Sequence, residues 1–207
     1  MMKKIQFALS LALIVFSLPM LAWGFIPPRR ETVSTPLLIP ADLPALPEAR
    51  TIHVTYAPVT RLGDSQVVEL NLSADGDVDG ENVYEEYNVI VEARLELEGA
   101  DARPADLVSA ALARGASPTF YWEVTQREAG AARGTVWLYL RFVPKAGGEE
   151  ARGPVLAQRV EARSRSVLGR TGSEARMGGV VGLFIGVGMG ILSARGRRDE
   201  SHGTGNI

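Results

Sequence analysis

An acidic stretch in the first half of the sequence has a spacing that is typical of a metal site. Asp75, Asp77 and Asp79 alternate, Gly80 follows them, and Glu86 lies seven positions after Asp79. This order matches D-x-D-x-D-G-x5-E, the pattern of a twelve-residue calcium loop. Because calcium prefers oxygen ligands, the pattern predicts that these carboxylates surround one calcium ion.

The backbone carbonyl of Glu81 is the further ligand that such a loop supplies, and Gly80 permits its sharp bend. The segment resembles the loop of the EF-hand family over these twelve residues alone, and that resemblance implies calcium as the cofactor. Two features depart from it: Asn82 takes a position that is usually apolar, and the flanking residues are typical of strands rather than helices. The alternative interpretation is an acidic, solvated connection between two strands.

Catalytic chemistry has little support in the residue types. His53 and His202 are the two histidines of the chain, and the second lies in its polar C-terminal tail. The chain has no cysteine, which excludes disulfides and thiolate metal sites. The net charge of −2 and the lack of a long basic block in the soluble part argue against nucleic-acid binding. We therefore expect a non-enzymatic protein.

The C-terminal stretch from Met177 to Ala194 contains no charged residue. As a helix its 18 residues extend over roughly 27 Å, close to the thickness of the bilayer's hydrocarbon core. Small residues recur every four positions in it, at Gly178, Gly182, Gly186, Gly190 and Ala194. Such a row lets two helix backbones approach closely in lipid. We predict a transmembrane helix that packs against another one, in a second copy or in a partner subunit.

A second apolar run, from Ile5 to Phe25, lies near the N-terminus. It suits a signal peptide, since Ala22 and Gly24 are small residues before a cleavage position, and its length also suits a retained signal-anchor helix. The sequence leaves both interpretations open. If the run is retained, Ala8 and Ala12 are its small residues that would suit the glycine row.

Basic residues near the ends of the two apolar segments indicate their orientation. Lys3 and Lys4 precede the first segment, and Arg195, Arg197 and Arg198 follow the second. Because basic residues prefer the cytoplasmic side, both chain ends are expected in the cytoplasm and the intervening domain outside it. Further arginines flank the segments on the domain side, but the rule weakens over so long a connection. The predicted location is the cytoplasmic membrane of a bacterial cell, crossed once or twice.

Between the apolar segments, residues 26–50 contain six prolines and are predicted to form an extended stalk. Residues 51–168 are predicted to form the domain, 169–176 a juxtamembrane linker and 195–207 a short cytoplasmic tail. The runs with strand character are residues 51–57, 66–72, 88–98, 119–125, 135–143 and 154–167. Residues 104–114 suit a short helix or an irregular crossover.

Six or seven short strands with turns between them favour an antiparallel, immunoglobulin-like β-sandwich. Residues 119–125 and 135–143 resemble a hairpin or an adjacent strand pair, with Trp122 and Trp137 as core anchors. The strand that carries Trp137 and Tyr139 is apolar on both faces, so these two aromatics are either half-buried or form a surface patch for carbohydrate or a partner. The predicted function is that of an accessory or scaffold subunit of a membrane assembly. The alternative is a surface ligand-binding module, calcium-dependent or not, with the helix as a plain anchor.

Overall fold

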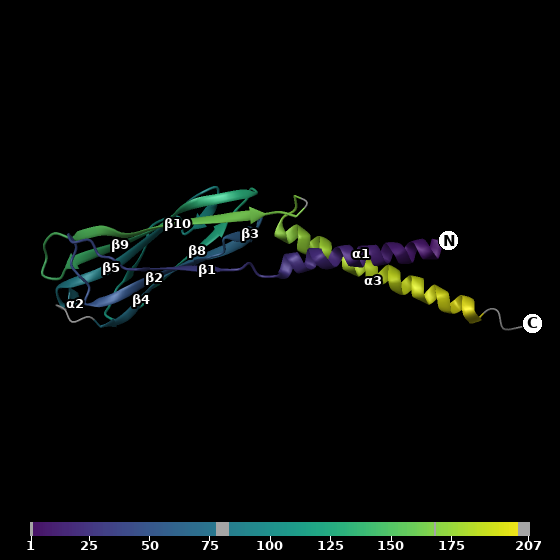
Figure 1. The fold of residues 1–207 in the computed structure, drawn as a ribbon, viewed down its shortest axis with the longest axis horizontal. Helices are drawn as coiled ribbons and strands as arrows, with labels where there is room; N and C mark the ends of the chain where they lie inside the picture. The colour runs from purple at the N-terminus through teal and green to yellow at the C-terminus, as the bar shows by residue number, and fades with distance from the viewer. Residues whose placement is uncertain (1, 78–82, 168, 203–207) are drawn as a thin grey trace, which may run out of the picture. The chain divides into compact units, whose positions relative to one another are not determined.

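The computed structural model describes residues 2–77, 83–167 and 169–202. The chain divides into two compact units (Figure 1). One unit contains residues 28–165 and is built of strands, and the other contains the two chain ends. The protein is therefore mainly β, with an apolar helix near each terminus, as the sequence predicts.

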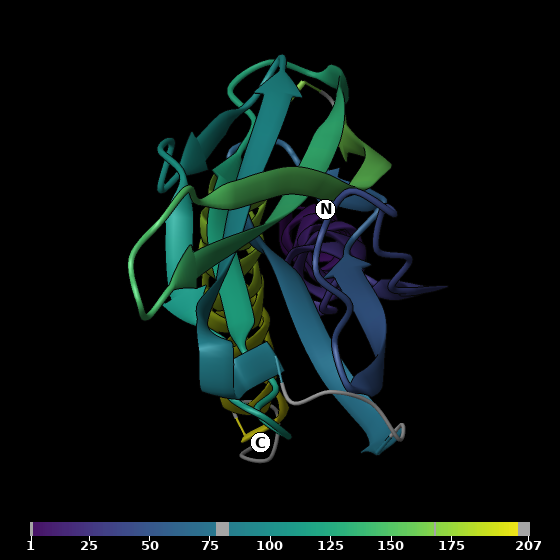
Figure 2. The ribbon, with the colours of Figure 1, turned by 90° about the vertical axis from the view of Figure 1, so that its left-hand side faces the viewer.

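The strand unit contains two five-stranded sheets, which Figure 2 shows from one end. In sheet A the order is β1 (Glu31–Pro36), β2 (Glu48–Tyr56), β4 (Ser65–Asp77), β8 (Thr119–Thr125) and β6 (Asp101–Arg103). In sheet B the order is β3 (Val59–Arg61), β10 (Ala151–Arg165), β9 (Gly130–Pro144), β5 (Tyr87–Glu98) and β7 (Val108–Ala111). A single short helical turn, α2 (Val83–Glu86), precedes β5. In the part of the chain that the structure describes, every strand pair is antiparallel except β3 with β10.

One hydrophobic core contains residues from both sheets. In β5 buried and exposed residues alternate over most of the strand: Val89, Val91 and Leu95 are buried, whereas Arg94 and Glu96 are exposed. Trp122 of β8 is fully buried, as predicted, and so is Phe142 of β9. Because successive strand residues point to opposite faces, the long central strands contribute about every second residue to this core.

The proline-rich segment is not the stalk that the sequence predicts. Residues 31–36 form β1, which pairs with β2 in sheet A. Further along, the apolar residues between the prolines turn toward the domain: Leu43 is buried in the core, and Leu37, Ile39 and Leu46 pack against it. Prolines tolerate an edge strand, where their missing N–H is not needed, and the apolar residues supply burial energy that a solvated stalk would lack.

Two local predictions in the second half of the domain are also wrong. β8 and β9 do not pair: β8 lies between β4 and β6 in sheet A, and β9 lies between β10 and β5 in sheet B. Residues 108–111, expected in a helix or a crossover, form β7 at the edge of sheet B. The reason in both cases is tertiary pairing, which overrides local pattern in short segments.

The terminal unit contains α1 (Met2–Phe25) and α3 (Gly172–His202). α3 begins within the predicted linker and continues into the predicted tail. Thr171 caps its start: the Thr171 hydroxyl accepts a hydrogen bond from the Glu174 N–H (3.2 Å), and the Glu174 carboxylate accepts one from the Thr171 N–H (2.9 Å). This capping box explains why the helix starts before the apolar stretch.

Candidate functional site

The strongest candidate site is the contact between α1 and α3, which run antiparallel. In each contact a small residue of one helix meets a residue of the other. The residue numbers rise along α1 as they fall along α3. The pairs are Ser10 with Gly190, Ile14 with Gly186, Ser17 with Gly182, Leu21 with Gly179, and Gly24 with Arg176. The α1 residues are spaced four, three, four and three apart, which is the spacing of a continuous helix-packing face.

The glycines of α3 are needed for this close approach. A Cβ atom on Gly186 would lie 2.8 Å from Cγ1 of Ile14, and one on Gly179 would lie 2.8 Å from Cγ of Leu21. A Cβ atom on Gly182 would meet the hydroxyl of Ser17. The contacts at Gly186 and Gly179 are too short for a real side chain, so a larger residue at either position would force the helices apart. At Gly182 the Ser17 hydroxyl would have to move.

Two serines of α1 are buried in the contact, although they interrupt an otherwise apolar run. Ser10 is 3% exposed and Ser17 is 4% exposed. The Ser10 hydroxyl donates a hydrogen bond of 2.6 Å to the carbonyl oxygen of Gly186. Sequence reasoning missed these residues, because a single serine within an apolar run does not by itself indicate a contact. Their signal is a seven-residue period, in which Ser10, Ser17 and Gly24 are all small.

The predicted glycine row is corrected at one position. Gly178 has no other atom near its Cβ position, and Gly179 takes its place in the contact. A strict four-residue row drifts around a helix of 3.6 residues per turn, so it cannot stay on one face. Ala8 and Ala12 of α1 are exposed and do not meet the row. The side chain of Ala194 lies outside the described residues.

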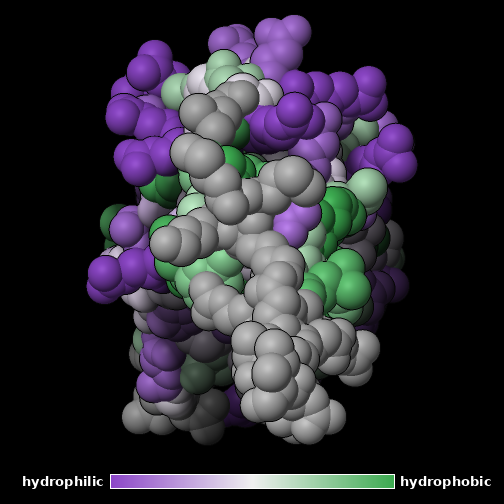
Figure 3. Space-filling model, turned by 90° about the vertical axis from the view of Figure 1, so that its right-hand side faces the viewer, coloured by the Kyte–Doolittle hydropathy of each residue, from purple (hydrophilic) through white to green (hydrophobic). Residues whose placement is uncertain are grey.

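The remaining surface of both helices is hydrophobic. Large apolar side chains are exposed along them, and hydrophobic residues are drawn in green in Figure 3. The most exposed include Phe184 at 74%, Leu192 at 71% and Phe16 at 62%. Both helices are long and apolar enough to cross a membrane. A surface of this kind suits the hydrocarbon of a lipid bilayer better than water.

The predicted calcium loop is described only in part. Asp79, Gly80 and Glu81 lie outside the described residues, as does the side chain of Asp77. The Asp75 carboxylate accepts hydrogen bonds from the hydroxyls of Thr51 and Ser73. Glu86 is exposed at the end of α2. Calcium binding therefore stays a prediction.

Trp137 and Tyr139 lie on the outer face of sheet B rather than in the core. Their rings stack at 6.4 Å between centroids, with 22° between planes. The Trp137 ring N–H donates to Glu96 (3.0 Å), and the guanidinium of Arg152 lies 4.5 Å from the centre of the Tyr139 ring. The prediction of Trp137 as a core anchor is wrong, because its register opposite Arg94 turns it outward.

A buried carboxylate lies opposite Tyr139 in the register of β5 and β9. Glu92 is 4% exposed, and its two oxygens lie 2.7 Å from Nε of Arg152 and 3.4 Å from Nη1 of Arg141. Arg141 also lies 3.4 Å from Glu150, so two carboxylates balance the two arginines. The face therefore combines aromatic rings with guanidinium donors, which are groups that bind sugars and anionic side chains.

A second buried ion pair lies in sheet A, where Glu48 and Arg50 are both almost fully buried. Arg50 also donates to the carbonyl oxygens of Ala116 (2.6 Å) and Ala113 (3.2 Å). The Tyr84 hydroxyl donates to Glu48 (2.7 Å). Burial, together with this hydrogen bond to Glu48, raises the pKa of Tyr84 to about 12. The network ties β2 to α2 and to the loop after β7.

His53 lies on β2, and both of its ring nitrogens are near serine hydroxyls. Its Nδ1 is 2.8 Å from the Ser34 hydroxyl, and its Nε2 is 3.2 Å from that of Ser73. The serines come from the neighbouring strands β1 and β4, so this chain of hydrogen bonds links three strands. Within the described ranges, no three histidine or acidic residues are grouped as a metal site requires.

Comparisons with known proteins give weak similarities. No protein-family model matches the chain, and no curated protein matches its sequence. One similar solved structure is a chain from the complex of zinc 2-glycoprotein and prolactin inducible protein from human seminal plasma, with a TM-score of 0.36 and 12% identity. The match covers 55% of this chain and 93% of that one.

A second similar structure is AggA, the major subunit of aggregative adherence fimbriae type I from Escherichia coli. Its TM-score is 0.31 and its identity 9%, over 56% of this chain and 95% of that one. Scores this low do not establish a shared fold, so the functional argument depends on the chain's own residues.

Proposed function

We propose that this is a non-enzymatic membrane protein in which α1 and α3 form an antiparallel hairpin within the cytoplasmic membrane. The hairpin anchors a β-domain, an immunoglobulin-like sandwich, on the extracytoplasmic side. The protein acts there as an accessory or scaffold subunit of a membrane assembly.

The observation that supports the proposal is that the two helices bury small residues and expose large apolar ones, the opposite of a water-soluble core. Their serines and glycines face each other, and their large apolar side chains face outward. In water this arrangement would expose the hydrophobic surface that normally drives folding. In lipid the apolar side chains contact hydrocarbon, and the small residues allow the two helices to pack closely. The contact also uses α1, which favours a retained signal anchor over a cleaved signal peptide.

The charges at the helix ends support the proposed orientation. Because the helices run antiparallel, the start of α1 and the end of α3 belong to the same end of the hairpin. Lys3 and Lys4 precede one apolar segment, and Arg195, Arg197 and Arg198 follow the other. All five basic residues thus belong on one side of the membrane, which is the cytoplasmic side by the positive-inside rule.

A gentle detergent purification of the full chain tests the accessory role. We expect a second membrane protein to co-purify in constant ratio. The double variant Gly182→Leu, Gly186→Leu should open the hairpin and lose that partner. Gly178→Leu and Gly188→Leu are the matched controls, because they add the same side chain where nothing lies within 4 Å. Recovery of the chain alone, or loss of the partner in the controls as well, would contradict the proposal.

The second candidate function is a surface ligand-binding module, which the stacked Trp137 and Tyr139 favour. A glycan array probed with the full chain in detergent, with and without Tyr139→Ala, tests carbohydrate binding. A calorimetric titration with calcium tests the acidic loop. If neither heat nor a rise in melting temperature appears at millimolar calcium, the loop is only a solvated connection.

A further inference from the structure

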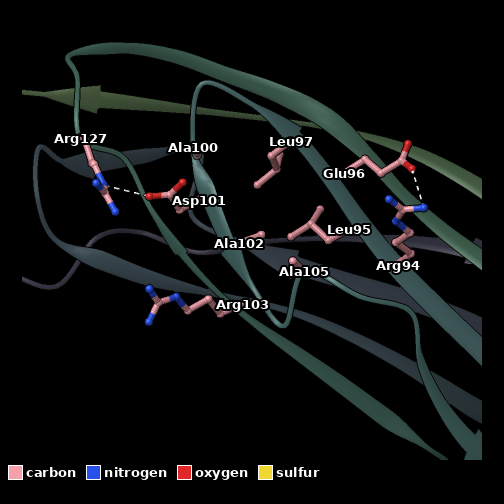
Figure 4. Close-up of a pocket in the computed structure, with 10 residues that line it drawn as sticks. All are labelled: Arg94, Leu95, Glu96, Leu97, Ala100, Asp101, Ala102, Arg103, Ala105 and Arg127. Carbon is pink, nitrogen blue, oxygen red and sulfur yellow. Dashed lines mark ion pairs between the residues drawn. The ribbon is translucent and has the colours of Figure 1, made fainter.

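A groove of the β-domain is lined mainly by residues of β5 and β6 and has a volume of about 540 Å³ (Figure 4). Its charged side chains lie close to opposite charges, and Figure 4 marks two ion pairs with dashed lines. Its third arginine, Arg103, lies opposite Glu123 in the register of β6 and β8. These charges balance, so they select neither an acidic nor a basic ligand.

A more specific feature lies at the end of α1, where the sequence contains a motif for proteolytic cleavage. Ala22 and Gly24 are small residues two apart, which suits a cut between Gly24 and Phe25. Hydrolysis of this bond would remove residues 1–24. In the structure the bond belongs to a folded helix, because α1 includes Phe25 and the Ile26 N–H donates a hydrogen bond to the Ala22 carbonyl oxygen (3.0 Å).

Arg176 of α3 covers this bond. Gly24 is buried, and a Cβ atom on it would lie 2.6 Å from Cγ of Arg176. The Arg176 guanidinium donates a hydrogen bond of 3.2 Å to the carbonyl oxygen of Gly24. This carbonyl is the group that a peptidase attacks when it cuts after Gly24. Both contacts would therefore have to be lost before the carbonyl could enter a peptidase site.

The helical conformation also separates the two small residues of the motif. Residues follow one another at about 100° around a helix, so residues two apart point to different sides. Ala22 is exposed, whereas Gly24 faces α3. In an extended strand residues two apart point to the same side, as binding in two neighbouring pockets requires. Cleavage therefore requires residues 22–25 to unwind, which breaks the two hydrogen bonds described above.

We propose that the bond between Gly24 and Phe25 is a proteolytic processing site that the α1–α3 contact masks. A membrane peptidase of the signal-peptidase class cuts it in chains whose helix pair is open and leaves it intact in chains whose pair has formed. In the cut, the C–N bond breaks, the oxygen of a water molecule joins the Gly24 carbonyl carbon, and the Phe25 nitrogen takes a proton. This inference rests on the proposed hairpin and names its regulation, because the closed contact decides whether α1 is kept.

The test uses the full chain in lipid bilayer discs and a purified bacterial signal peptidase, with intact-mass spectrometry to measure the cut. The unchanged chain should lose residues 1–24 only slowly. The double variant Gly182→Leu, Gly186→Leu should lose them at least about tenfold faster, because cleavage follows the population of the open form. Gly178→Leu, Gly188→Leu is the matched control and should behave like the unchanged chain, since nothing lies within 4 Å of either Cβ position.

Three further substitutions locate the effect. Arg176→Ala removes the hydrogen bond to Gly24 and should speed the cut about threefold. Arg170→Ala removes an exposed arginine just before α3 and should not change the rate. Adding Ala22→Leu to the double variant should restore resistance, because it removes a small residue of the motif at an exposed position. General unfolding of the helices would not be reversed by this change.

Four results would overturn the inference. They are equal rates in the unchanged chain and the double variant, a cut at another bond, a cut that persists after Ala22→Leu is added, and equal effects of Arg176→Ala and Arg170→Ala.

The outcomes also separate this inference from the proposed function. Rapid loss of residues 1–24 from the unchanged chain would show that α1 is a cleaved signal peptide, and the proposed hairpin would fail. If the unchanged chain and the double variant both keep these residues, the hairpin stands and the masking proposal fails.

Discussion

The two units of this protein bury opposite kinds of residue. In the β-domain the largest side chains are inside: Trp122 and Phe142 have no exposed surface. In the helix pair the smallest residues are inside, with Ser10 and Ser17 against glycines, while Phe184 is 74% exposed. This difference is the one expected if the domain folds in water and the helix pair lies in lipid, as we propose. Water drives large apolar groups together, whereas in lipid the helices associate through close backbone contact and hydrogen bonds.

Polar burial differs between the units as well. The domain buries Glu48 and Arg50 as a charged pair with further hydrogen bonds. The helix pair buries hydroxyls, of which Ser10 bonds to a backbone carbonyl. A buried charge that loses its partner has a large desolvation cost, but a lost serine hydrogen bond in a membrane helix pair costs little. The first pair should therefore affect stability much more than the second.

The largest effect is expected from removing the central side chain of the domain core. Trp122→Ala should lower the free energy of unfolding by about 3–5 kcal/mol, because it removes a fully buried ring and leaves a cavity. Denaturant unfolding of the full chain in detergent, followed by tryptophan fluorescence, measures it. Tyr121→Ala on the exposed face of the same strand is the control and should cost less than about 0.5 kcal/mol. Equal losses would contradict the assigned core.

The second largest loss of stability is expected from breaking the buried ion pair between Glu48 and Arg50. Glu48→Gln leaves the Arg50 charge buried without its counter-ion and should cost about 3 kcal/mol in the same unfolding experiment. Glu96→Gln removes a half-exposed partner of Arg94 and should cost less than about 0.5 kcal/mol. If the two substitutions lower the free energy of unfolding by the same amount, the Glu48 network is not buried.

In the helix pair, removing a polar group should have a smaller effect. Ser10→Ala loses the hydrogen bond to Gly186 but keeps the close packing, so it should weaken the α1–α3 contact by about 0.6 kcal/mol. The redox equilibrium of an engineered cysteine pair across the helices, in glutathione buffers, measures this change. Gly186→Leu in the same assay should abolish the contact. A loss of several kcal/mol from Ser10→Ala would show that polar bonding, not packing, holds the helices together.

The smallest effect concerns alkaline pH. The raised pKa of Tyr84 means that the folded domain holds this proton more tightly than the unfolded chain does. Its contribution to stability is complete below pH 10.0, the ordinary pKa of a tyrosine, and is lost as the pH rises toward about 12. Tyr84→Phe should flatten the decline of stability across this window, and Tyr121→Phe should not. An unchanged slope in Tyr84→Phe would contradict the role of the hydrogen bond to Glu48.

Much of the fold can be predicted from the sequence where the pattern is long. The two apolar segments and the central strands, such as β5 with its regular alternation, follow from periodicity alone. The short edge strands β1, β6 and β7 do not, because pairing with a neighbouring strand decides them rather than their own residues.

Only the α3 side of the candidate site could be predicted from the sequence. The glycine row of α3 indicates close packing, but the partner residues Ser10 and Ser17 appear as imperfections of an apolar run. Which small residues face each other depends on helix rotation and crossing, and these are tertiary properties. Sequence spacing therefore identified the surface of α3 and missed the surface of α1 that covers it.

The most direct test of the central claim is a disulfide between Ser17→Cys and Gly182→Cys, formed in native membranes. A Cβ atom on Gly182 would lie 3.6 Å from that of Ser17, within the range of a disulfide, and the chain has no other cysteine. Ala12→Cys with Gly188→Cys is the control pair, since neither position touches the other helix. We predict a monomer with an internal disulfide whose intact mass includes residues 1–25. A mature chain that lacks this segment, or disulfide-linked dimers alone, would contradict the retained hairpin.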